Sequence, residues 1–319
     1  MPSEFDLISR HFSRATGHTD LAGGDDGALL TASAGMQLVV STDMLVAGTH
    51  FFSDCDPESL GWKTLAVNVS DIAAMGATPR WATLALSLPV ADEAWLTAFA
   101  RGFYDCATTF DIDLIGGDTT RGPLNLCPTI FGEVPSGCAV TRDGARPGHD
   151  LWISGQPGRA ALALAALRGE LELGPAYRDE FMLALHRPQP RVALGKALRG
   201  LASAMLDVSD GVLGDLGHII ERSQVGCVLD TDSIPIAALT AACPDPQRTM
   251  QALLHGGDDY ELLFTAAAAH REQILAISHT LALPLHRIGR IDDQRGHLRT
   301  QAANGTEKPL PACGFDHFN

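Results

Sequence analysis

Acidic residues recur beside glycine and serine in a pattern that could bind metal ions. The triplet Gly-Gly-Asp occurs at residues 23–25, 116–118 and 256–258, and a Ser-Asp pair occurs at residues 70–71 and 209–210. Any single Gly-Gly-Asp is most simply explained by turn formation, because both residue types adopt turn conformations easily. The repeated pattern, at what we predict to be strand ends, favours a ligand site instead, because ligands bind at the strand ends of open sheets.

Carboxylates that converge in this way require cations. Two unit charges about 4 Å apart repel by roughly 4 kcal/mol at an effective dielectric constant near 20. Several aspartates without a nearby set of Cys and His residues select a hard cation such as Mg²⁺ or Mn²⁺. Because Mg²⁺ commonly bridges carboxylates to substrate phosphates, the pattern predicts phosphate binding through metal ions.

Four further residues carry weaker signals. His50 lies beside aromatic residues, and its residue type alone favours a structural role. Asn68 and Asp71 share one face of a predicted apolar helix, where an Asn beside an Asp needs partners, so we favour a site over a solvated surface. Arg142 could bind a phosphate, but an isolated Arg before a turn usually lies at the surface.

Several common catalytic motifs are missing from the sequence. It contains no G-x-x-x-x-G-K-[ST] phosphate loop, no G-x-G-x-x-G after a predicted strand and no G-x-S-x-G. The H-R-D and D-F-G elements of protein kinases are absent as well. These absences argue against a P-loop NTPase, a Rossmann dinucleotide enzyme, an α/β-hydrolase and a protein kinase.

Length and composition predict an acidic protein of about two domains. The chain has 319 residues, of which 45% are hydrophobic, and 23 Lys and Arg oppose 38 Asp and Glu for a net charge of −15. This charge disfavours nucleic acid and anionic lipid as partners. With no apolar run of membrane-spanning length, no secretory signal and seven scattered cysteines lacking a C-x-x-C pair, we expect a cytoplasmic protein with reduced thiols.

Predicted strands and helices alternate along both halves, which indicates an α/β or α+β fold. We predict strands at residues 36–43, 81–88, 113–115, 124–134, 151–154 and 205–208, and helices at residues 60–74, 93–108, 158–169, 192–204 and 212–223. A segment rich in turn-forming residues covers positions 135–150. We place the domain junction there, with domains at residues 1–137 and 138–319.

The motifs together closely resemble the thiamine-monophosphate kinase family over nearly the whole chain. The matching segments are GGDDGALL (23–30), STDMLVAGTHF (41–51), GWKTLAVNVSDIAAMGATP (61–79), LIGGDTTRGP (114–123), LWISGQPG (151–158), RPQPRVALG (187–195), LDVSDGVLGDLGHI (206–219), GGDDYELLFT (256–265) and GFDHF (314–318). Aminoimidazole ribonucleotide synthetase, selenophosphate synthetase and the hydrogenase-maturation dehydratase share only the general plan. A selenophosphate synthetase is disfavoured because no Cys precedes Gly23.

The resemblance implies a two-domain fold like that of aminoimidazole ribonucleotide synthetase. The N-terminal domain would bind ATP and metal and form a homodimer, and a C-terminal α/β domain would pack behind it, with ATP and several Mg²⁺ ions between the domains. The implied reaction is direct in-line transfer of the ATP γ-phosphate to thiamine monophosphate, giving thiamine diphosphate and ADP. No residue is expected as a covalent nucleophile, and no general base is needed, because the accepting phosphate oxygen is already ionised at neutral pH.

The resemblance also implies roles for individual residues. The expected metal ligands are Asp26, Asp43, Asp71, Asp118, Asp207 and Asp210. The expected ATP contacts are Ser41, Thr42, Phe110, Gly117, Asp118, Arg142 and Ser209. The expected substrate contacts are His50, Asp258 and Phe315. For His50 the resemblance replaces the structural interpretation. Asp258 departs from the family, which usually has Glu there, and the shorter side chain would need a bridging water.

Two other functions are compatible with the sequence. An ATP-dependent synthetase of the aminoimidazole ribonucleotide type would keep the fold and change the reaction. A non-catalytic, dimeric nucleotide-binding module is the other alternative, and the intact motifs throughout the chain argue against it.

Overall fold

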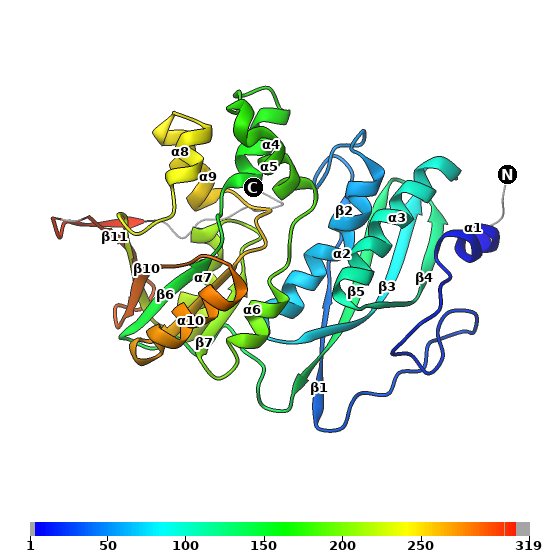
Figure 1. Cartoon of the computed structure of the whole chain (residues 1–319), viewed down its shortest axis with the longest axis horizontal. Helices are drawn as coiled ribbons and strands as arrows, with labels where there is room; N and C mark the ends of the chain where they lie inside the picture. The colour runs from blue at the N-terminus through cyan, green and yellow to red at the C-terminus, as the bar shows by residue number, and fades with distance from the viewer. Residues whose placement is uncertain (1–3, 303, 311–319) are drawn as a thin grey trace. The chain divides into compact units, whose positions relative to one another are not determined.

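The computed structural model describes residues 4–302 and 304–310 of the chain (Figure 1). The chain divides into two compact units. The N-terminal unit comprises Met1–Ala73 and Ala77–Gly137, and the C-terminal unit comprises Ala74–Gly76 and Cys138–Asn319. Among the described residues, no helix has the length and apolar character needed to cross a lipid bilayer. Both units combine a sheet with helices, which confirms the predicted α/β class.

The N-terminal unit contains a mixed five-stranded sheet. Its main path runs β1 (Met36–Thr42), β5 (Asn125–Pro135), β3 (Thr78–Leu88) and β4 (Asp113–Arg121), and the short β2 (Leu45–Val46) also pairs with β5. Strands β3 and β4 are parallel, whereas β5 pairs antiparallel with β1, β2 and β3. This order leaves β1 and β4 at the two edges of the path.

Helices α2 (Pro57–Ala74) and α3 (Glu93–Phe110) lie against this sheet, and α1 (Glu4–His11) precedes it (Figure 1). Helix α3 begins where the Asp92 carboxylate accepts the backbone N–H groups of Ala94 and Trp95. Glycine permits close contact between the two helices, because a Cβ at Gly102 would lie 1.7 Å from the Glu58 carbonyl oxygen. Helix α2 is therefore held firmly against α3 and the sheet.

The C-terminal unit contains a seven-stranded sheet in the order β12, β11, β8, β10, β6, β9 and β7. The strands are β6 (His149–Ser154), β7 (Ala202–Asp207), β8 (Gly226–Asp230), β9 (Leu262–Ala267), β10 (Leu285–Asp292), β11 (Leu298–Gln301) and β12 (Glu307–Leu310). The helices are α4 (Arg159–Leu167), α5 (Pro175–His186), α6 (Val192–Ala197), α7 (Val212–Ser223), α8 (Ala237–Ala242), α9 (Pro246–His255) and α10 (Arg271–Leu281), with a 3₁₀ turn at Ala268–His270.

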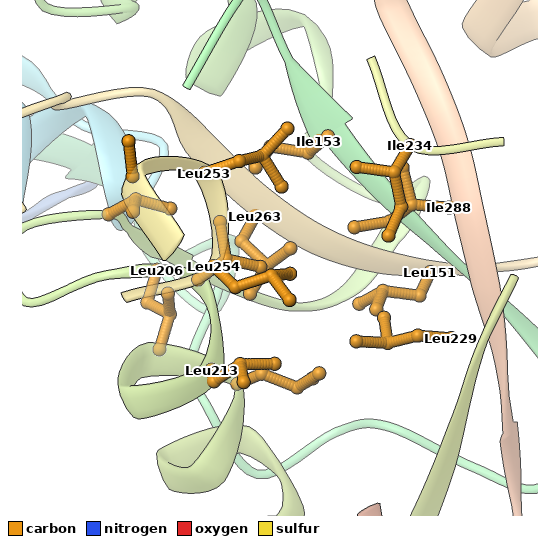
Figure 2. Packing of buried hydrophobic residues seen from close by; sticks show 14 of the residues in the cluster. Leu151, Ile153, Leu206, Leu213, Leu229, Ile234, Leu253, Leu254, Leu263 and Ile288 are labelled. Atoms are coloured by element: carbon orange, nitrogen blue, oxygen red, sulfur yellow. The ribbon is translucent and has the colours of Figure 1, made fainter. Parts of the chain in front are cut away.

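Helices bury both faces of this sheet, as the alternation along β6 shows. Leu151 and Ile153 belong to one apolar cluster together with residues of α4, α5, α7 and α9, whereas Trp152 belongs to a second cluster with residues of α6 and α10. Figure 2 shows part of the first cluster, in which Leu213 and Leu254 lie close to side chains of the sheet. Because this sheet is packed on both faces, the ends of its strands are held in place, including the end of β7 at Asp207.

Two local predictions were wrong. Strand β4 does not end before the second Gly-Gly-Asp but continues to Arg121, and Gly117 sits inside it with φ +155° where a Cβ would lie 1.9 Å from the Leu84 carbonyl oxygen. The helix predicted for residues 192–204 ends at Ala197, because Gly200 takes φ +74° and β7 begins at Ala202. Of the three Gly-Gly-Asp triplets, therefore, none follows directly on the end of a strand; the first lies in a loop and the third follows α9.

Candidate active site

In the N-terminal unit, two predicted metal ligands, Asp43 and Asp71, each make a hydrogen bond where the end of β1 lies against α2. The Ser41 hydroxyl donates to Asp71 Oδ2 at 2.5 Å, and the Asn68 amide Nδ2 donates to Asp43 Oδ2 at 2.5 Å. Asn68 and Asp71 are three residues apart on α2 and share a face, and Asp43 follows Ser41 by two residues, just after β1 ends at Thr42. The end of β1 and helix α2 thus hold each of the two aspartates through a hydrogen bond.

Asn68 fixes the direction of Asp43. Its side chain is fully buried, and its Oδ1 has no hydrogen-bond partner among the described residues. The amide cannot turn around, because Nδ2 must face the carboxylate, which only accepts. A buried carbonyl without a partner is costly, so a donor reaching this position would be favoured.

The exposed Asp118 lies on the same sheet at a distance from Asp43. Asp118 pairs with Ala85 on β3, and Ala85 pairs with Cys127 on β5. Burial raises the pKa of the Cys127 thiol, and the nearby charge of Asp43 raises it further. Two strands, β3 and β5, therefore lie between Asp118 on β4 and the strand β1, which Asp43 follows directly.

Asp26 lies exposed in a loop that is anchored beside β4. The Asp113 carboxylate accepts the backbone N–H groups of Gly17 and His18 and the hydroxyl of Thr19, at distances from 2.6 to 3.1 Å. These bonds lower the pKa of Asp113 even though burial opposes them. The anchor directs the first Gly-Gly-Asp along β4, where a Cβ at Gly23 would lie 3.9 Å from the Ile115 carbonyl oxygen.

The remaining predicted residues of this unit have distinct surroundings. His50 is half-buried, and its Nδ1 accepts the N–H of Val46 at 3.0 Å, so the neutral ring carries its proton on Nε2. The exposed Thr42 hydroxyl lies 2.8 Å from that of Thr129. Phe110 ends α3, and its ring centroid lies 6.3 Å from that of the buried Trp62.

In the C-terminal unit, the structure brings the segments around Asp210 and Asp258 together. Asp207 ends β7 and is buried. Beyond it, the Ser209 carbonyl accepts the N–H of Asp258 at 2.9 Å, and Gly257 passes so close that a Cβ there would lie 2.2 Å from the same carbonyl oxygen. Position 257 must therefore be glycine for the two segments to make this contact.

Asp258 itself takes a conformation that is uncommon for its residue type. Its φ is +66°, and its Oδ1 accepts the Tyr260 hydroxyl at 3.0 Å. Tyr260 also has a positive φ, of +53°. Two left-handed residues in three positions fold the chain back onto residues 208–210.

Behind this segment lies an ion-pair cluster that the sequence did not reveal. Glu261 is 1% exposed, and its carboxylate accepts two bonds from Arg191, at 2.7 and 2.5 Å, and one from the Ser154 hydroxyl at 2.6 Å. Burial opposes ionisation of Glu261, but Arg191 lowers its pKa overall. Burial raises the pKa of the neighbouring Asp259, whose carboxylate accepts the N–H of Gly158 at 2.7 Å.

Asp215 is a second residue absent from the predicted site. It is 4% exposed, and its Oδ2 accepts the backbone N–H groups of both Ser209 and Asp210 at 3.1 Å. Burial raises the pKa of Asp215 to about 7, although the N–H groups of Asp210 and Ser209 and the charge of Arg142 oppose this. A signal was present in the sequence, because Asp215 stands three and four residues from Val212 and Ile219 on the apolar face of α7.

The described carboxylates do not form a closed metal-binding cage by themselves. Among residues 4–302 and 304–310, no three His, Cys, Asp or Glu side chains converge as a metal-binding group. The donor chemistry still fits a hard cation, because Asp43, Asp71 and the unpartnered Asn68 Oδ1 offer only oxygen. Phe315, the predicted aromatic substrate contact, lies outside the described residues.

Comparisons with known proteins match both halves of the chain. Residues 24–134 and 142–300 match the N-terminal and C-terminal domains of the AIR synthase related protein family. The thiamine-monophosphate kinase of Escherichia coli K12 is 43% identical over 99% of this chain and 98% of its own length.

Solved structures with similar folds include proteins of the same name. The crystal structure of thiamine-monophosphate kinase from Stenotrophomonas maltophilia K279a is 47% identical, with a TM-score of 0.84, over 93% of this chain and 94% of that one. A structure described as AaThiL complexed with AMPPCP and TMP is 29% identical, with a TM-score of 0.77, over 92% of this chain and 91% of that one. From the shared motifs, the two matched domains and the full-length identity, it follows that this chain belongs to the thiamine-monophosphate kinase family.

Proposed function

We propose that this chain transfers the γ-phosphoryl group of ATP to the phosphate of thiamine monophosphate, giving thiamine diphosphate and ADP. The observation that carries the proposal is identity of 43% over 99% of the chain to a kinase of that name. A structural relative named as a complex with AMPPCP and TMP supports the same pair of substrates, since AMPPCP mimics ATP.

We further propose that Mg²⁺ serves the reaction. Bound Mg²⁺ would neutralise the charge of the two phosphate-bearing reactants. Its proposed ligands are Asp26, Asp43, Asp71, Asp118, Asp207 and Asp210. Asn68 and Ser41 support this assignment, because they hold Asp43 and Asp71 in fixed directions before any ligand arrives. Such preorganisation lowers the cost of placing charge correctly in the transition state.

The remaining contacts complete the proposed site. ATP would contact Ser41, Thr42, Phe110, Gly117, Asp118, Arg142 and Ser209, and thiamine monophosphate would contact His50, Asp258 and Phe315. For His50, the bond that Nδ1 accepts from Val46 supports a role for the Nε2–H as a donor to an anionic substrate.

Product analysis tests the proposed reaction directly. The chain is incubated with ATP, Mg²⁺ and thiamine monophosphate, and thiamine diphosphate and ADP are measured by chromatography. Equal amounts of both products are expected, and ADP release without thiamine diphosphate would favour a synthetase instead. Asp118→Asn and Asp210→Asn should each reduce turnover at least 100-fold, and full turnover in both would overturn the metal assignment.

We also propose a homodimer formed through the N-terminal unit. Strand β1 lies at a sheet edge, and its alternate residues Met36, Leu38 and Val40 are 38%, 47% and 54% exposed on one face. Apolar residues gathered on an edge strand are typical of an interface. Val40→Lys should yield a monomer in light scattering, while Leu275→Lys, which alters an equally exposed residue of α10, should not.

For the cellular location, we propose the cytoplasm. The six cysteines in the described part of the chain are all free, which suits a reducing compartment. Fluorescence microscopy of a tagged chain in its source cell would test this.

A further inference from the structure

We propose that Asp215 is a positioning residue for the phosphate-binding turn at Ser209 and Asp210. The inference rests on the proposed function, which assigns ATP and metal contacts to these two residues. Asp215 itself belongs to helix α7 and is buried, so it is not expected to touch either substrate.

The first observation is that one carboxylate oxygen holds two consecutive peptide groups. Asp215 Oδ2 accepts the N–H of Ser209 and the N–H of Asp210, each at 3.1 Å. Rotation of either peptide plane would break one of these bonds. Asp215 therefore limits the directions in which both side chains leave the backbone.

The opposite side of the same peptides is held as well. The carbonyl of Val208 accepts the N–H of Tyr260 at 2.8 Å, and the carbonyl of Ser209 accepts the N–H of Asp258 at 2.9 Å. Each of the two peptide groups is thus bonded through its N–H to Asp215 and through its C=O to the segment that carries Asp258. The turn is clamped between α7 and the proposed substrate-contacting segment.

The third observation is the choice of residue type at a buried position. A carboxylate on the apolar face of α7 is costly, and an aliphatic residue would pack there without that cost. Two neighbouring N–H groups that point inward are also costly unless an acceptor meets them. The two N–H groups of this turn need an acceptor, which is a physical reason for an aspartate at position 215.

Three variants separate positioning from other roles. Asp215→Asn keeps an oxygen that can accept both N–H groups and removes the charge. Asp215→Leu removes the acceptor and keeps the branch at Cγ with a larger side chain, and Asp215→Ala removes it with space for a water molecule. Glu221→Gln is the matched control, because Glu221 is an exposed acidic residue of the same helix.

Hydrogen exchange of the Ser209 and Asp210 amides, followed by NMR, gives a measurement that does not depend on activity. Exchange should be at least 10-fold faster in Asp215→Leu and Asp215→Ala, and near the wild-type rate in Asp215→Asn and Glu221→Gln. Unchanged protection in Asp215→Ala would overturn the proposal, and this variant decides the matter if Asp215→Leu does not fold.

Kinetics should follow the same order. We expect kcat to fall at least 50-fold in Asp215→Leu and Asp215→Ala, with the Mg²⁺ concentration for half-maximal rate raised at least 5-fold. Asp215→Asn should stay within about 5-fold of the wild type in both quantities. If Asp215→Asn is as impaired as Asp215→Leu, the charge itself acts and positioning through the two N–H groups is refuted. If the wild type makes no thiamine diphosphate, the proposed function fails, while hydrogen exchange still decides whether Asp215 holds the turn.

Discussion

Removing the charge of Glu261 should destabilise the C-terminal unit more than any surface substitution. Glu261 is 1% exposed and pairs with Arg191, whose side chain is 21% exposed. Loss of one partner from a buried pair costs about 3–5 kcal/mol, because the other charge stays buried without compensation. The partial exposure of Arg191 places Glu261→Gln near the lower limit, about 3 kcal/mol. For a unit of this size, that corresponds to a melting temperature lower by about 6–12 °C.

Differential scanning calorimetry at pH 7 measures this effect, and Glu180→Gln provides the control. Glu180 also pairs with an arginine, at 2.9 Å from Arg159, but its side chain is 56% exposed. Exposed pairs contribute about 0–1 kcal/mol, so the control should melt within about 4 °C of the wild type. A melting temperature for Glu261→Gln within 2 °C of the wild type would refute the reasoning.

The pH dependence supplies an independent check. Because the pKa of Glu261 is lowered in the folded chain from its ordinary value of 4.5, the ionised side chain contributes its full stabilisation above pH 4.5. That contribution is lost as the pH falls through the lowered pKa. The difference between the wild type and Glu261→Gln should therefore narrow in scans below pH 4.5, and a difference that widens there would contradict the assigned pair.

Three further predictions concern the N-terminal unit and the proposed ligands. Asn68→Leu should lower kcat by 10-fold or more, because it removes the amide that holds Asp43. It should change the free energy of unfolding by only about 1 kcal/mol, because the loss of that one hydrogen bond is offset in part by removal of an amide oxygen that lacks a partner. Activity and stability lost to a comparable degree would indicate a purely structural residue. Mg²⁺ with ATP at 100 times its dissociation constant should stabilise the folded chain by about 2.7 kcal/mol, and a flat response in a thermal scan would argue against a metal–nucleotide site. Gly102→Ala should destabilise by about 1–3 kcal/mol, since its Cβ would lie 1.7 Å from the Glu58 carbonyl oxygen, whereas Gly17→Ala, with nothing within 4 Å, should not, as urea denaturation would show.

The sequence predicted most elements because their signals are local. The helix at residues 212–223 has its predicted bounds, since an apolar face repeating every three or four residues begins after Gly211 and ends before the left-handed Gln224. The prediction for β4 was wrong because Gly-Gly normally ends a strand. Only the partner strand reveals that Gly117 is needed there to pass the Leu84 carbonyl group.

The sequence by itself determined the class of fold, the family and the residue types available for binding phosphate through cations. These follow from the periodicity of apolar residues and from motifs of neighbouring residues. Tertiary structure alone decided which polar side chains meet, both at the proposed ligands and in the core. Asn68 bonds to Asp43, which is 25 residues away in the chain, and Glu261 bonds to Arg191, which is 70 residues away. Asp215 accepts a hydrogen bond from a backbone N–H group that precedes its own helix. Such contacts depend on how strands and helices pack, because a buried polar side chain needs a hydrogen-bond partner, and packing decides which group lies within its reach.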